Sequence, residues 1–204
     1  MRRRKVRGDK MPPPARETRA LPGVGLTFRS MRTIIAGVGY MNLSDSSIGP
    51  VAILELQKQS WPKNIKVDDL SYGPISVVHN FVEANPRYDR MVLITAADFG
   101  AQPPAMRWHR WPAILPHPEE IQARVVEAAT GVIDWNNLLV ILQQFEVLPA
   151  EVYVIAVQPV ETTFGMELSP GVQELFPEVL RLARELAGDA TAETPEQAVA
   201  ADHA

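Results

Sequence analysis

The sequence predicts an α/β domain in which helices cover both faces of a mostly parallel sheet. Short runs of β-branched and apolar residues alternate along the chain with segments of helical periodicity. One of these runs, 91–97, is almost continuously apolar, which is typical of a strand buried on both faces. The 204 residues, 46% of them hydrophobic, are enough for one full core. We therefore expect a single folded domain.

The first half of the domain is predicted to hold two strands and two helices. The first strand spans 32–36 and runs into a turn at Gly37-Val38-Gly39. A helix is expected over 50–59, because the missing N–H of Pro50 costs nothing in a first turn. A short strand follows at 65–70, and apolar spacing predicts a helix over 74–84. The apolar stripe of that helix comprises Ile75, Val78 and Val82.

The second half repeats the alternation around the buried strand at 91–97. Helices are predicted over 119–129 and 135–147, and the most strand-like run of the chain is 152–157. The stripe of the 135–147 helix comprises Leu138, Leu139, Ile141, Leu142 and Phe145. A last helix opens at Ser169-Pro170, with a kink expected at Pro177, and ends near Gly188. The Trp- and Pro-rich stretch 103–118 is interpreted as a loop.

The charge of the chain is divided unevenly between its ends and its body. The net charge is −4, but residues 1–30 carry nine Lys and Arg against two acids, whereas 31–204 carry eleven against twenty-two. We expect 1–30 to be a basic disordered extension, 31–188 the folded domain, and 189–204 an acidic disordered tail. Because the body is acidic, the sequence argues against a nucleic-acid partner.

The absence of cysteine excludes a disulfide framework, a thiolate zinc site and a cysteine nucleophile. It fits a reducing compartment. No apolar run approaches the eighteen residues of a membrane span, and no apolar segment follows Arg2-Arg3-Arg4 as an export signal requires. We therefore expect a cytoplasmic protein with no membrane partner.

Ligands of such sheets bind beyond the carboxyl ends of the strands. This rule points to the turn 39–49, to the segment after Ala97 and to the segment after Val157. Asp45 lies in the first of these segments, and Asp98 directly follows the buried strand. A carboxylate there can cap a helix, ligate a metal or act as a base. Capping is favoured for Asp45, and the role of Asp98 stays open.

Two other chemistries find little support. Gly37-Val38-Gly39 begins like a dinucleotide fingerprint, but its third glycine would fall at Asn42. Without that glycine we expect no close packing of helix on strand and no seat for a pyrophosphate. His109 and His117 lie eight residues apart in the expected loop, a spacing that matches no zinc motif.

Five segments in order resemble the motifs of one family, the hydrogenase maturation endopeptidases. The run 34–40 followed by Asp45-Ser46-Ser47-Ile48-Gly49 resembles the opening strand, G-x-G-N and D-[DE]-x-x-G of that family. Asp68 to Gly73 resembles its D-G-G-T-x-G turn, and 93–98 its strand ending in Ala-Asp. The segments 154–161 and 167–170 resemble its closing G-x-x-P-E and its LSP helix start. The resemblance covers 31–188.

This resemblance implies a fold, an activity and a partner. The fold is a three-layer α/β/α sandwich with a mostly parallel, twisted sheet of about five strands. The activity is that of an endopeptidase that removes a C-terminal peptide from the large-subunit precursor of a nickel–iron hydrogenase after metal insertion. In the family, three side chains recognise nickel on the substrate, so nickel is contacted there and is not a prosthetic group.

Carried over by position, only one of the three nickel-recognising residues is intact. The aspartate after the third strand is Asp98, the acid of the first turn falls at Ser46, and the family's histidine falls at Asp134. The resemblance thus implies Asp98 and Asp134 as catalytic and metal-contacting residues, with Ser46 in the third position. It implies a turn-shaping role for six further residues, namely Gly37, Gly39, Asp45, Gly49, Asp68 and Gly73.

The departures from the family leave three interpretations open. A carboxylate in place of an imidazole offers harder oxygen donors, which suit nickel less well, and serine in place of an acid removes a charge. The chain is then a divergent protease, or a non-proteolytic relative that binds the large subunit as an assembly chaperone, or a protein that kept the fold for another purpose.

Two tryptophans of the predicted 103–118 loop, Trp108 and Trp111, are candidates for partner contact, because aromatic anchors dominate protein interfaces. The alternative is that both tryptophans cap the edge of the sheet.

Overall fold

The computed structural model describes residues 30–112 and 114–188. Most of the expected basic extension at 1–30 and all of the expected acidic tail at 189–204 lie outside the described residues. No helix within the described ranges is long and apolar enough to cross a membrane.

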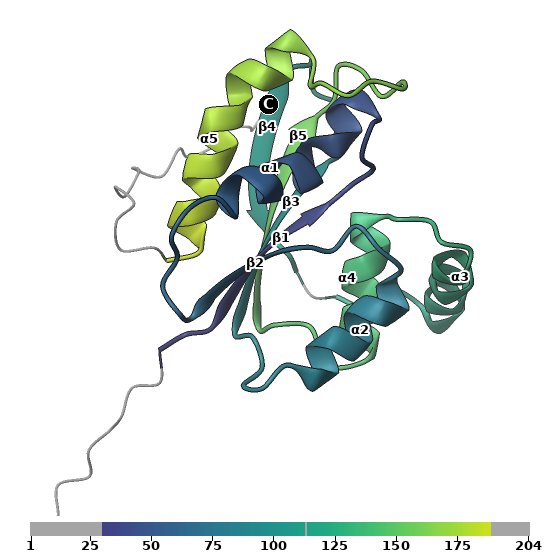
Figure 1. The fold of residues 1–204 in the computed structure, drawn as a ribbon. Helices are drawn as coiled ribbons and strands as arrows, with labels where there is room; N and C mark the ends of the chain where they lie inside the picture. Colours follow the sequence, from purple (N-terminus) through teal and green to yellow (C-terminus); the bar gives the residue numbers. More distant parts are fainter. Residues whose placement is uncertain (1–29, 113, 189–204) are drawn as a thin grey trace, which may run out of the picture.

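A five-stranded, mostly parallel sheet forms the centre of the molecule (Figure 1). Its strand order is β2-β1-β3-β5-β4, and only β4 runs antiparallel, paired with β5. The strands are β1 (Thr33–Val38), β2 (Ile65–Asp69), β3 (Arg90–Ala96), β4 (Ala105–Arg110) and β5 (Glu151–Gln158). The predicted fold class is therefore confirmed.

Helices cover both faces of this sheet. On one face lie α1 (Ile48–Leu56), preceded by the 3-10 turn η1 (Ser44–Ser47), and α5 (Pro170–Leu186). On the other face lie α2 (Pro74–Glu83) and α4 (Trp135–Gln144), and α3 (Pro118–Ala129) packs outside them (Figure 1). The molecule is thus a three-layer sandwich.

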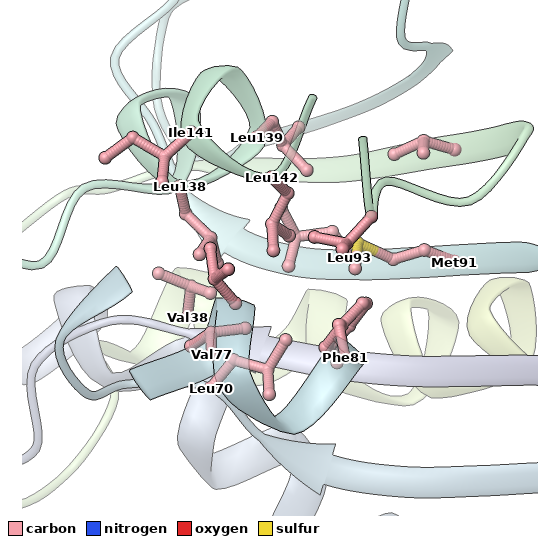
Figure 2. Packing of buried hydrophobic residues seen from close by; sticks show 14 of the residues in the cluster. Val38, Leu70, Val77, Phe81, Met91, Leu93, Leu138, Leu139, Ile141 and Leu142 are labelled. Carbon is pink, nitrogen blue, oxygen red and sulfur yellow. The ribbon is translucent and has the colours of Figure 1, made fainter. Parts of the chain in front are cut away.

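The core divides into two halves because successive strand residues point to opposite faces. In β3, Met91 and Leu93 pack toward α2 and α4, whereas Val92 and Ile94 pack toward α1 and α5. Figure 2 shows the first half, in which α4 side chains meet α2 side chains such as Phe81 over the strands. These four β3 residues are fully buried, two on each face of the sheet, as the apolar run predicts.

Two predicted apolar stripes are partly wrong. In α2, Ile75 and Val82 are exposed, and the helix buries Val77, Val78 and Phe81 instead. The buried set follows the i, i+1, i+4 spacing of a face turned by about one residue from the predicted one. In α4, Phe145 is exposed because the helix ends at Gln144.

The interpretation of 103–118 as a loop is wrong for its first part, which forms strand β4. In this strand Met106 and Trp108 alternate with Arg107 and His109 over only four residues, and Arg110 then places a charge on the face of the two apolar residues. The strand exists because β5 offers it a ladder of backbone partners from Gln158 to Tyr153, nearly fifty residues later in the chain. Local sequence carries no trace of such a long-range pairing.

Candidate functional site

Asp45 lies in the η1 turn with its carboxylate fully buried. Its Oδ2 accepts hydrogen bonds from the backbone N–H groups of Val160 and Glu161, both at 2.9 Å, and from Ser169 Oγ at 2.8 Å. Its Oδ1 accepts a fourth from Ser169 N at 2.7 Å. Ser169 is the N-cap residue of α5, so Asp45 binds the start of that helix and not of the helix that follows it in sequence.

The segment 159–169 lies against the η1 turn through further backbone contacts. Ser44 N donates to Gly165 O and Gly165 N donates to Asn42 O, both at 3.0 Å, and Ser44 Oγ donates to Thr163 O. A Cβ on Gly165 would lie 2.4 Å from Ser44 Oγ. The turn after β1 is therefore fixed by a segment more than a hundred residues away.

Gly37 and Gly49 let α1 approach β1 closely. A Cβ on Gly37 would lie 2.5 Å from Gly49 O, and a Cβ on Gly49 would lie 2.5 Å from Val38 O. The expectation that helix and strand do not pack closely without a glycine at position 42 is wrong, because Gly49 fills that role from within α1. Gly39 has a similar restriction, with Ser46 O only 2.2 Å from its hypothetical Cβ.

A cavity of about 190 Å³ opens at the carboxyl edge of the sheet, between the ends of β1 and β3 and the start of α4. Ser46 and Asp134 both line it, together with Tyr40, Thr95 and Trp135. The remaining lining residues are Val38, Gly39, Ala96 and Ile133. The structure thus brings two of the three predicted site residues into one cavity, although 88 positions separate them in the sequence.

Asp134 reaches this cavity as the N-cap of α4. Its Oδ1 accepts a hydrogen bond from Asn137 N at 2.6 Å, which satisfies one free N–H group of the first helical turn. Within the described residues its Oδ2 has no hydrogen-bond partner, so one carboxylate oxygen stays available to a ligand. The capping bond fixes the side chain of a residue that lines the cavity.

Asp98 is the third predicted site residue, and it is not among the lining residues of the cavity, although Ala96, two residues earlier, is. It follows β3 by two residues, is exposed, and its Oδ1 accepts from Gly100 N at 2.9 Å and from Gln158 Nε2 at 3.0 Å. These two bonds, the backbone one first, lower the pKa of the Asp98 carboxyl below its ordinary value. The side chain is therefore ionised near neutral pH.

Two residues at this edge were missed by sequence reasoning. The Tyr40 hydroxyl accepts a hydrogen bond from Ile133 N at 2.7 Å and so joins the turn after β1 to the segment before α4. Gln158 ends β5 and orients Asp98. Signals existed for both: Tyr40 stands where the resembled motif has asparagine, and Gln158 directly follows Val157 at a strand end.

In the predicted turn at 68–73, Asp69 and not the predicted Asp68 accepts a hydrogen bond from the turn backbone. Asp68 forms an ion pair with Lys66 at 2.7 Å, whereas Asp69 Oδ1 accepts from Ser71 N at 2.9 Å. Ser71 Oγ in turn accepts from Gly39 N at 3.1 Å and so connects this turn to the one after β1. Gly73 stands in open space as the N-cap residue of α2.

The two tryptophans differ in their surroundings. Trp108 lies on the edge strand β4, 48% exposed, with its ring 6.1 Å from that of Tyr153. Trp111 follows the strand and is partly buried, edge-on to Trp135 at 6.0 Å. Both therefore lie at the edge of the sheet, as the alternative interpretation expects, and a partner contact stays a prediction.

Chemically, this edge offers oxygen donors from a serine, a threonine and two aspartates. Among residues 30–112 and 114–188, no three His, Cys, Asp or Glu side chains are grouped so that they could hold a metal ion. Hard oxygen donors of this kind fit a nickel ion less well than a set that includes imidazole.

No family model and no curated protein matches this chain in sequence. Solved structures do match in fold. An endopeptidase from Escherichia coli solved in solution aligns with a TM-score of 0.61 at 19% identity, over 80% of this chain and 96% of its own. The hydrogenase maturating endopeptidase HybD from E. coli aligns with a TM-score of 0.58 at 20% identity, over the same shares.

A third similar structure comes from an archaeon. The hydrogenase 2 maturation peptidase from Thaumarchaeota archaeon SCGC_AB-539-E09 aligns with a TM-score of 0.54 at 20% identity, over 76% of this chain and 96% of its own. Identities this low establish the architecture and no shared site residues. The chain therefore has the α/β fold of the hydrogenase maturation endopeptidases.

Proposed function

We propose that this protein is a divergent hydrogenase maturation endopeptidase of the cytoplasm. Its substrate is the large-subunit precursor of a nickel–iron hydrogenase, from which it removes a C-terminal peptide after nickel insertion. The observation that carries the proposal is the convergence of Ser46 and Asp134 on one cavity at the carboxyl edge of a sheet with this fold, where Asp98 follows the end of β3.

In this proposal Asp98 and Asp134 contact the nickel ion borne by the substrate. Asp134 contributes its Oδ2, since Oδ1 is engaged by Asn137 N. Asp98 stays ionised because its pKa is lowered by the Gly100 and Gln158 bonds, which suits contact with a cation better than proton abstraction at neutral pH. Asp134, whose Oδ2 is not engaged by the capping bond, is the candidate for activating water, and Ser46 occupies the third position as a neutral donor or acceptor.

The second candidate is a non-proteolytic relative that binds the same precursor as an assembly chaperone. One observation favours it: Asp98 is turned toward Gly100 and Gln158, and the described residues offer no group of three acidic or imidazole ligands. A chaperone needs the fold and a binding surface but not the catalytic carboxylates.

The test is co-expression with a cognate large-subunit precursor, followed by the intact mass of the large subunit. If the protein is an endopeptidase, the large subunit should lose its C-terminal peptide when it is co-expressed with the wild-type protein and keep the peptide with Asp98→Ala or Asp134→Ala. Glu83→Ala is the matched control, because Glu83 is an exposed acid at the end of α2, away from the cavity. It should leave cleavage unchanged.

Co-purification of the precursor separates the two candidates. A chaperone would hold the precursor equally well in the wild-type protein and in both Asp variants, and the large-subunit mass would not depend on this protein. Cleavage that persists in Asp98→Ala and Asp134→Ala would contradict the proposed site.

A further inference from the structure

The outer edge of β4 presents unused backbone hydrogen-bonding groups. In an antiparallel pair, alternate residues bond to the partner strand while the others point away from it. Trp111 N donates to Val152 O, which sets the phase of the ladder, so Arg107 and His109 bond to β5. The N–H and C=O groups of Met106, Trp108 and Arg110 therefore point outward, since β4 is the last strand of the sheet.

The other side of β5 confirms this phase. Glu151 N donates to Asp89 O and Ala97 N donates to Val157 O, so the odd-numbered residues of β5 face β3 and the even-numbered ones face β4. None of the described residues forms a hydrogen bond with the outward backbone groups of β4. A further strand can thus pair with this edge without displacing any existing bond.

Charge distinguishes this edge from the rest of the molecule. Residues 31–188 carry eighteen acids against eleven Lys and Arg, yet the twenty residues from 99 to 118 contain no acid and include Arg107, His109 and Arg110. Both arginines are exposed, and neither forms an ion pair within the described ranges. The Arg107 guanidinium stacks 4.3 Å above the ring of Phe99, which holds it in place.

The two faces of β4 differ in polarity, so a strand paired with β4 would carry different side chains on its two faces. Arg107 and His109 point to the α4 face, as the contact of His109 with Trp135 shows. Met106 and Trp108 point to the α5 face, where Met106 packs against the core and Trp108 meets Tyr153. A complementary strand places acids on the first face and apolar side chains on the second, because opposite residues of paired strands interact directly.

We propose that β4 binds an extended segment of a partner protein in which acidic and apolar residues alternate, and that this segment becomes a sixth strand of the sheet. This is the strand-addition mode of peptide recognition, in which backbone bonds give affinity and alternate side chains give specificity. The proposal is independent of the endopeptidase activity proposed above.

A second copy of this chain fits the edge poorly. Two β4 edges paired with each other would bring the arginines of both copies together, and like charges on paired edges are the usual barrier to self-association. Charge repulsion thus disfavours pairing of β4 with a second β4, whereas an acidic strand would be attracted to this edge.

The test uses the folded protein and a capped, fluorescein-labelled peptide, (Glu-Val)4. Fluorescence anisotropy should show saturable binding that weakens as salt is added. Two peptides are controls: (Lys-Val)4, which reverses the charge, and a (Glu-Val)4 peptide N-methylated at alternate residues, which loses the backbone donors of one edge. Neither control should bind, and equal binding of either would overturn the proposal.

Protein variants test the same contact from the other side. Arg107→Glu should weaken binding of (Glu-Val)4 about tenfold, because it sets like charges opposite each other. Lys63→Gln, which removes an exposed charge at the far edge of the sheet, should leave binding unchanged. Thermal unfolding of both variants checks that the fold is kept.

Amide hydrogen exchange distinguishes strand pairing from a non-specific charge contact, because only strand pairing would protect alternate amides of β4. Without peptide, the amides of Met106, Trp108 and Arg110 should exchange fast, and those of Arg107 and His109 slowly. The peptide should slow the fast set. Binding without this alternating protection, or a dimer in light scattering that competes with the peptide, would contradict strand addition to β4.

Discussion

Asp45 carries a carboxylate into the interior with no cation beside it among the described residues. Four hydrogen-bond donors replace the water that this group loses on burial. Such bonds to an ionised group are stronger than neutral ones, and here two come from Val160 and Glu161 and two from Ser169. A single side chain thus joins η1, the segment 159–169 and the start of α5.

Asp45→Asn should lower the free energy of unfolding by about 3 kcal/mol, because the amide nitrogen would face N–H donors and leave buried groups unpaired. Urea unfolding followed by circular dichroism measures this loss. Glu174→Gln removes the same charge from an exposed site on α5 and should change stability little. Similar effects of the two substitutions would contradict the role assigned to Asp45.

His109 should titrate below the ordinary value of 6.5, because burial lowers its pKa first and the nearby positive charge of Arg107 lowers it further. As the pH falls through 6.5, the unfolded chain takes up this proton before the folded protein does. Stability therefore declines toward acid in that range. Nuclear magnetic resonance of the ring protons gives the pKa, and Arg107→Gln should raise it. A midpoint at or above 6.5 would refute this account.

At the scale of elements, two glycines decide how α1 sits on β1. Every nearest neighbour of a Cβ on Gly49 is a backbone atom, so none can move aside as a side chain would. Gly37 and Gly39 are visible in the sequence, but without a third glycine at position 42 they led us to expect no close packing of helix on strand. The contact of Gly37 with Gly49 cannot be recognised in the sequence, because it depends on how α1 packs on β1.

Gly49→Ala should destabilise the protein by about 3 kcal/mol, at the upper end of overpacking costs. Gly73→Ala is the matched control, since nothing lies within 4 Å of its hypothetical Cβ and its φ is −50°. Its stability should stay within about 1 kcal/mol of wild type. Melting temperatures of the two variants measure this difference. An unchanged melting temperature for Gly49→Ala would contradict the close contact between α1 and β1.

Elements with a strong local pattern were predictable, and an element defined by its partner was not. The apolar run 91–97 predicted β3, and the helix predicted over 119–129 begins only one residue earlier, at Pro118. Strand β4 has charged residues on both faces and depends on β5 for its existence. The face of α2 was misjudged by one residue because Val77 and Val78 are adjacent and either supports a stripe.

At the scale of the whole molecule, topology carried more of the site than local chemistry did. The rule that ligands bind at the carboxyl ends of strands brought together the turn with Ser46 and the strand before Asp98. The place of Asp134 came from the resemblance to a family, and the cavity agrees with it. Tyr40 bonds a backbone N–H ninety-three residues away, and no sequence pattern marks such a partner.

The anchoring of Asp45 also sets an order of events during synthesis. Ser46, Asp98 and Asp134 all leave the ribosome before Val160, Glu161 and Ser169, whose groups hold Asp45 and hence its neighbour Ser46. A nascent chain that ends before these residues contains Ser46, Asp98 and Asp134 but lacks the hydrogen bonds to Asp45 that hold its neighbour Ser46. We therefore expect the position of Ser46 to be fixed only after residues 160–169 have been made, so that an unfinished chain carries the site residues before all of them are held in place.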